Sequence, residues 1–176
     1  MAVTFQAEDG TGRDDATSFL EIAELVQIAE DYGYDIATLT TDDLKKQYCN
    51  RYSQLLDQKY IWPGVIKVST QSLSWPRKEA YDINYNLIDD DSVPADIKRA
   101  VVIMIKTALA GTDLVPVQDV NGAVKRLRDE VVGAVVAERE YASTGATVPR
   151  IPELENALKK ILGSTTGNGI SVGVIR

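Results

Sequence analysis

The chain has 176 residues, of which 44% are hydrophobic and 26% charged, as expected for one globular domain. It contains no histidine and one cysteine, which excludes histidine-based catalysis, histidine zinc sites and any disulfide within the chain. The net charge of −7 argues against a dedicated nucleic-acid binder, which needs clustered Lys and Arg, but allows a protein that surrounds DNA without gripping it.

The N-terminal region is predicted to be a loop followed by an amphipathic helix. The acidic stretch at residues 8–15 is interpreted as a solvated loop, because the ligand spacing of an EF-hand calcium site is missing. Thr17 or Ser18 is the expected N-cap, since Glu21 follows Ser18 by three residues as in a capping box. Apolar residues at helical spacing then run to Gly33, which is expected to end the helix.

A second helix is predicted from the threonine and aspartate residues at 40–43 to about Tyr60. Its Tyr48 and Tyr52 lie at helical spacing and are assigned to packing against a neighbouring helix, which is commoner than stacking on nucleotides. Cys49 falls between them and is expected to be a small core residue, not a reactive thiol.

Residues 61–93 are predicted to be irregular. Residues 65–68 suit a short extended piece, and residues 82–91 suit an exposed loop, because they combine asparagines with consecutive aspartates. The three aspartates at 89–91 invite a metal-site hypothesis. Three consecutive residues rarely converge on one ion, however, so no metal is expected there.

Five residues are interpreted as structural anchors, because each combines an aromatic ring or a proline with a break in the helical pattern. A proline favours extended backbone before it and is tolerated in the first turn of a helix. Two of the prolines therefore predict helix starts, one for a central core helix and one for a last helix. The five anchors are Trp62, Trp75, Pro76, Pro94 and Pro152.

Residues 123–141 change to a period of two, with a glycine between two alternating runs. This pattern predicts a β-hairpin with one apolar and one charged face, and a helix over residues 121–132 stays open as the alternative. The basic residues are too few and too interleaved with acids for a nucleic-acid patch, so a solvated or interface-lining strand is expected. If the protein forms a ring, the residues assigned to a surface between subunits are Val124, Arg126, Arg128, Val135, Arg139 and Tyr141.

The C-terminal segment, residues 163–176, leads from Gly, Ser and Thr into an apolar, β-branched ending. One interpretation is a last strand folded back on the domain. The other is an extended arm that adds a strand to a neighbouring subunit or partner, since such a segment spans about 40 Å at roughly 3.3 Å per residue. Partner binding is assigned to Ile170, Val172, Val174, Ile175 and Arg176.

No motif for catalysis, cofactor binding or membrane insertion is found. The chain has no phosphate loop, no dinucleotide fingerprint and no CxxC pair. It has no long apolar run, and its first residues lack the pattern of a signal peptide. We therefore expect no enzyme activity, no cofactor, no metal and no membrane contact, with a carboxylate-based hydrolase the one enzymatic alternative left open.

Six short motifs follow one another in a distinctive order. They are Glu-Asp-Gly-Thr-Gly at 8–12, Ala-Thr-Ser at 16–18, Trp-Pro-Gly at 62–64, Leu-Ser-Trp-Pro-Arg at 73–77, Val-Pro at 93–94 and Ile-Pro at 151–152. Over roughly residues 3–162 this order resembles a phage family often labelled DnaT-like single-stranded DNA-binding. Such phage proteins resemble the adaptors that attach beneath the portal. The resemblance therefore implies a helical bundle with a β-hairpin, assembled as a dodecameric ring around a DNA channel.

The expected fold is mainly α: a small helical bundle over residues 1–162 with a β-hairpin near 123–141, and an extended C-terminal arm over 163–176. The expected function is that of a structural virion protein, a head-tail connector that joins the portal to the tail. Its expected partners are identical subunits, the portal, which the arm would grip, and tail or nozzle proteins, which loop 82–92 would contact. DNA would pass through the ring without specific binding during genome ejection.

The expected location is the head-tail junction of the virion, with assembly in the host cytoplasm. The alternative function is a single-stranded-DNA-binding replication or packaging factor. That alternative requires a basic groove with exposed aromatic rings, which the acidic composition does not favour.

Overall fold

Four α-helices and two small antiparallel strand pairs make up the computed structural model, which describes residues 4–115, 127–131, 134–139 and 150–162. The chain divides into two compact units, a helical unit (residues 1–111 and 151–176) and a hairpin unit (residues 112–150). The mainly α fold with a β-hairpin confirms the predicted fold class. The predicted arm at 163–176 lies outside the described residues.

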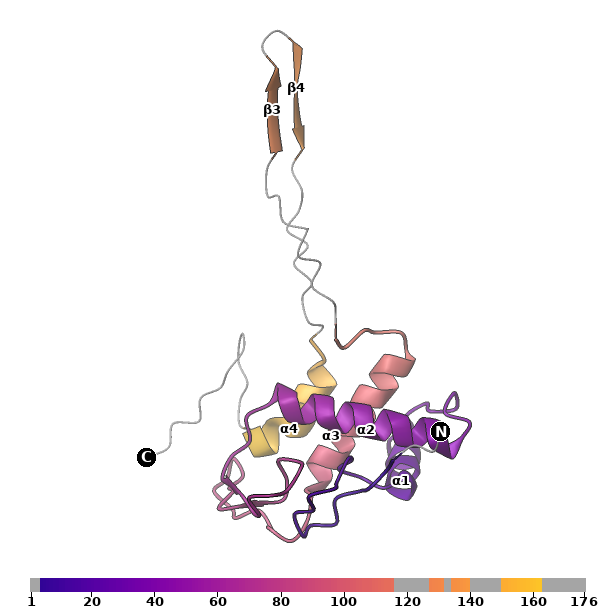
Figure 1. Ribbon diagram of the computed structural model, residues 1–176, viewed down its shortest axis with the longest axis vertical. Coiled ribbons are helices and arrows are strands. Elements are labelled where there is room, and N and C mark those ends of the chain that lie inside the picture. The colour runs from indigo at the N-terminus through magenta and orange to yellow at the C-terminus, as the bar shows by residue number, and fades with distance from the viewer. Residues whose placement is uncertain (1–3, 116–126, 132–133, 140–149, 163–176) are drawn as a thin grey trace. The chain divides into compact units, whose positions relative to one another are not determined.

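The helical unit is organised around α3 (Ala95–Leu109), as predicted for a central core helix. It contacts α1 (Ile22–Tyr32), α2 (Asp42–Lys59) and α4 (Pro152–Leu162), and Figure 1 shows it passing behind α2 and beside α4. The six consecutive residues 100–105 are all buried. A single amphipathic stripe would bury only one side, so α3 is covered by its neighbours on several sides.

Three helix starts follow the capping and proline signals of the sequence. Thr41 caps α2, because its hydroxyl accepts a hydrogen bond from the N–H of Leu44 at 3.3 Å. Pro94 lies directly before α3, and Pro152 is the first residue of α4. The N–H that proline lacks has no hydrogen-bond partner within the helix at these positions, so its absence costs nothing. Gly33 ends α1 in left-handed backbone, with φ of 66°. These predictions are confirmed.

The start of α1 differs from the prediction. Its N-cap is Glu21, whose N–H donates to the carboxylate of Glu24 at 2.9 Å. Ser18 lies instead in extended backbone, and its carbonyl accepts a hydrogen bond from the N–H of Glu8 at 2.8 Å. This pairing with the N-terminal segment overrides the local capping signal, so the predicted N-cap at Thr17 or Ser18 is wrong.

Between α2 and α3 the chain has little regular structure, as predicted. The strand β1 (Val65–Ile66) pairs antiparallel with β2 (Arg77–Lys78), which confirms the first half of the expected extended piece. A single antiparallel bridge joins Tyr81 to Leu87 further along. Apart from this short strand pair and the single bridge, the region consists of loops that hydrogen-bond to one another.

The hairpin unit contains the predicted β-hairpin. β3 (Leu127–Val131) pairs antiparallel with β4 (Ala134–Arg139), and the register is irregular between Asp129 and Val131. The period of two in the sequence matches this pairing. The helix that residues 121–132 also allowed is wrong where β3 lies.

Two further features concern the cysteine and the apolar content of the helices. Cys49 is fully buried in α2, as predicted, and burial raises the pKa of its thiol to about 12. Such a thiol stays protonated at neutral pH and is a poor nucleophile. Among the helices of the described residues, none is both long enough and apolar enough to cross a membrane.

Candidate interaction surfaces

The two tryptophans meet inside the helical unit. Trp75 is fully buried and Trp62 nearly so, and their rings pack edge to face, with centroids 6.1 Å apart and an interplanar angle of 80°. This is a favoured geometry for aromatic pairs. The peptide bond between Trp75 and Pro76 is cis. The pair therefore belongs to the core and offers no exposed ring for a ligand.

Arg77 joins the two Trp-Pro motifs through the backbone. Its guanidinium donates to the carbonyls of Pro63 and Gly64, each at 2.6 Å, and to that of Ser74 at 3.3 Å. Gly64 has φ of 74°, and a Cβ placed on it would lie 2.4 Å from the Lys78 carbonyl oxygen. The motifs at 62–64 and 73–77 are thus held together by hydrogen bonds and close packing, which gives them a structural role.

The acidic loop at the N-terminus is also built into the fold. The carboxylate of Glu8 is buried and accepts hydrogen bonds from the N–H groups of Gly10, Gly12 and Arg13 at 2.9 to 3.0 Å. A Cβ on Gly10 would lie 1.8 Å from the Asp91 carbonyl oxygen. The prediction of a solvated loop is wrong for Glu8, Gly10 and Gly12, which are buried because backbone donors compensate the buried charge.

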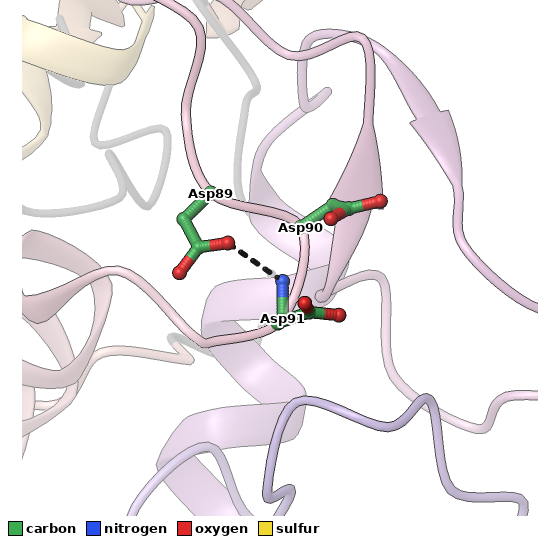
Figure 2. A group of neighbouring side chains, drawn as sticks. All are labelled: Asp89, Asp90 and Asp91. Atoms are coloured by element: carbon green, nitrogen blue, oxygen red, sulfur yellow. Dashed lines mark hydrogen bonds between the residues drawn. The ribbon is translucent and has the colours of Figure 1, made fainter.

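The three consecutive aspartates lie on one turn (Figure 2). The N–H of Asp91 donates to the carboxylate of Asp89 at 3.1 Å, and one carboxylate oxygen of each aspartate lies within 4.8 Å of the others. These three oxygens lie near one another, but the side chains point in different directions (Figure 2). The ammonium of Lys67 forms an ion pair with Asp91, however, so part of this negative charge is already compensated by the protein. The cluster alone does not establish a cation site.

Residues 81–87, here called the apolar loop, expose four apolar side chains. Tyr81, Ile83, Tyr85 and Leu87 are 50%, 47%, 88% and 66% exposed, whereas Asp82 between them is buried. The prediction of an exposed loop is correct in this part, but it rested on the polar residues and overlooked the apolar ones. The missed signal is the strict alternation of the sequence, Tyr-Asp-Ile-Asn-Tyr-Asn-Leu.

Asp82 holds the apolar loop in one shape. Its carboxylate accepts hydrogen bonds from the N–H of Asn86 at 2.9 Å, from the side chain of Asn86 at 3.1 Å and from the N–H of Asn84 at 2.8 Å. These bonds, those from Asn86 first, lower the pKa of Asp82 below its usual range. The N–H of Ile83 donates to the carbonyl of Lys160 at 2.9 Å, which ties the loop to α4.

An aromatic and charged cluster joins α1, α3 and α4. The carboxylate of Glu153 accepts hydrogen bonds from the Tyr34 hydroxyl and the Lys106 ammonium, both at 2.6 Å. The Arg99 guanidinium lies over the half-exposed ring of Tyr32, 4.0 Å from its centroid. The pairing with Lys106, followed by that with Tyr34, lowers the pKa of Glu153. Sequence reasoning missed this cluster, because its members come from three separated elements.

The predicted interface residues are only partly within the described chain. Arg128 lies in β3, and Val135 and Arg139 lie in β4. The other predicted hairpin residues, Val124, Arg126 and Tyr141, lie outside the described residues, as do all five residues of the predicted arm. The structure therefore gives the hairpin backbone but does not describe the arm.

Comparison with known proteins gives one match. A family model described as "Putative DnaT-like ssDNA binding protein" matches residues 3–176, which is nearly the whole chain. No curated protein and no solved structure matches the sequence.

Proposed function

The chain belongs to the DnaT-like family, and we propose that its role is structural: a ring-forming adaptor that joins the portal of a tailed phage to its tail. In this proposal the protein continues the DNA channel and lets DNA pass without specific binding. It works at the head-tail junction of the virion and assembles there from subunits made in the host cytoplasm. It uses no cofactor and catalyses no reaction.

The hairpin unit is the observation that carries this proposal. β3 and β4 form a two-stranded sheet, and neither outer edge pairs with another strand of the described residues. A lone two-stranded hairpin is marginally stable in water and exposes unpaired backbone groups along both edges. A ring supplies the missing partners, because each hairpin then contacts a different face of the next subunit and the contacts close on themselves.

The distribution of charge supports passage of DNA over tight binding. The chain has 26 acidic and 19 basic residues, of which six and five lie in the hairpin unit. The remaining 20 acidic and 14 basic residues give the helical unit a net charge of −6. A protein that neutralises phosphates needs an excess of Lys and Arg at its binding face. An acidic wall instead repels the DNA backbone, which suits a channel.

The remaining parts of the proposal concern partners. The C-terminal arm, with its apolar residues at 170–175, is assigned to the portal. Loop 82–92, which overlaps the apolar loop, is assigned to the tail or nozzle proteins. The dodecameric ring would match the symmetry of a portal. These assignments rest on apolar patterning and on exposure of the loop.

Single-stranded DNA binding is the second candidate, because the family description names it. Within the described residues, the cluster of Tyr32 and Arg99 is the feature that suits it best, since a half-exposed ring beside a guanidinium can stack on a base. Glu153 lies in the same cluster and pairs with Lys106. That carboxylate offsets the positive charge a DNA strand would need, which makes this candidate the weaker one.

Co-sedimentation with the cognate portal separates the two candidates. The full chain is compared with a version that ends at Leu162, and both are titrated with single-stranded DNA at about 50 and 200 mM salt. Portal binding that is lost on truncation supports the adaptor and its arm. Salt-sensitive DNA binding without portal binding would replace the adaptor by the DNA-binding function, and a Tyr32→Ala variant would then locate the stacking site.

A further inference from the structure

We propose that the apolar loop is the docking site for the chain's own C-terminal segment, residues 170–175, in the free subunit. This inference goes beyond the adaptor proposal and does not depend on it, because it concerns the isolated chain. It assigns an occupant to a surface that the fold leaves exposed within the described residues.

The apolar loop has the properties of a preformed binding surface. Its outward residues include Tyr85, which is 88% exposed, and Leu87, which is 66% exposed. The hydrogen bonds of Asp82 and the bond from Ile83 to Lys160 fix the backbone beneath them. A rigid loop loses little conformational entropy on binding, so its apolar area is available for affinity. Four neighbouring exposed apolar side chains are more than the scattered ones that normal surfaces carry.

The position of the loop makes the C-terminal segment its nearest candidate occupant. The carbonyl of Lys160, which accepts the bond from Ile83, lies two residues before the end of α4 at Leu162. The segment at 170–175 is joined to α4 by residues 163–169, whose sequence is Gly-Ser-Thr-Thr-Gly-Asn-Gly. A free chain of this composition and length spans about 15 Å on average. Such a short connection gives an effective concentration in the millimolar range.

The segment and the loop are both apolar. Ile170, Val172 and Val174 alternate with Ser171 and Gly173, a pattern that would place these three apolar side chains on one face of an extended segment and Ile175 on the other. The apolar loop exposes Tyr81, Ile83, Tyr85 and Leu87, and an antiparallel bridge between Tyr81 and Leu87 brings its two ends together. At a millimolar effective concentration, even an intrinsic Kd of about 100 μM would leave the segment docked roughly ten times as often as free.

A disulfide cross-link in the full chain tests this docking. The variant Leu87→Cys/Val174→Cys is oxidised at low micromolar protein concentration. The control is Glu30→Cys/Val174→Cys, in which the first cysteine takes an exposed position of α1. The native Cys49 is buried and does not compete. We expect an intramolecular cross-link that forms about tenfold faster in the loop variant than in the control and at a rate independent of protein concentration. Equal rates in the two variants would overturn the proposal.

The same experiment distinguishes a second copy as the occupant. A cross-linked dimer as the main product, with a rate that rises with protein concentration, would overturn docking within one chain. Hydrogen exchange of the full chain without introduced cysteines gives an independent measurement. We expect the amides of residues 170–175 to exchange about tenfold faster in Tyr85→Ser/Leu87→Ser than in the native chain, and unchanged exchange would overturn the proposal.

Discussion

Replacing Gly64 by alanine should destabilise the protein much more than the same change at Gly33. Both glycines have left-handed backbone, with φ of 74° and 66°. The left-handed conformation costs alanine about 1–2 kcal/mol, and the loss of chain freedom in the unfolded state offsets about 0.4–1 kcal/mol of this. Gly33 has nothing within 4 Å of an added Cβ, so Gly33→Ala should cost only about 1 kcal/mol.

At Gly64 the added Cβ also meets backbone. It would lie 2.4 Å from the Lys78 carbonyl oxygen and 2.8 Å from the Ala80 nitrogen, so the loops joined by Arg77 must separate. Overpacking of this kind costs about 1–3 kcal/mol more, for a total of about 3 kcal/mol. For a chain of this size that corresponds to a fall in Tm of about 6–12 °C, against about 2–4 °C for Gly33→Ala.

Thermal unfolding followed by circular dichroism measures both variants under the same conditions. The fall in Tm of Gly33→Ala measures the cost of left-handed backbone alone. The additional fall in Gly64→Ala measures the cost of the clash between the added Cβ and the backbone of Lys78 and Ala80. Equal falls in Tm would refute the reasoning, because they would show that the interlock of residues 62–64 with 73–77 does not constrain the fold.

Three further predictions concern single side chains. Glu153→Gln should make the free energy of unfolding depend less on pH under acidic conditions. Because the pKa of Glu153 is lowered in the folded protein, its carboxylate stabilises the fold above about pH 4.5, and this stabilisation is lost as the pH falls further. The urea midpoints of the variant and the native protein should therefore converge below that pH. Cys49 should resist a thiol reagent at pH 8 in the folded protein and react fully in urea, and rapid labelling of the native state would contradict its burial. Glu8→Ala should cost about 2–3 kcal/mol in urea unfolding, because three backbone donors lose their acceptor, and a loss below about 0.5 kcal/mol would show that water replaces it.

The sequence predicted those parts of the fold that local signals determine. Thr41, Pro94 and Pro152 mark helix starts through caps and prolines, which act within one turn. The hairpin followed from its period of two. The start of α1 was predicted wrongly, because Ser18 pairs with Glu8, and such a pairing cannot be read from the residues around a helix end.

The candidate surfaces depended more on tertiary contacts. Burial of Glu8 requires three backbone donors that only the folded loop brings together. The bonds of Arg77 to Pro63 and Gly64 join segments thirteen or more residues apart, so neither motif indicates the other. The apolar loop is visible in the sequence, because apolar and polar residues alternate strictly over 81–87. The prediction of an exposed loop used only the polar residues of this stretch.

The proposed function requires that this protein form a ring on a portal. The most direct measurement is native mass spectrometry of the complex between the cognate portal and the full chain. We expect twelve copies bound to one portal ring, with no nucleic acid needed for assembly. Free portal beside free subunits, together with a complex between the subunit and single-stranded DNA, would contradict it.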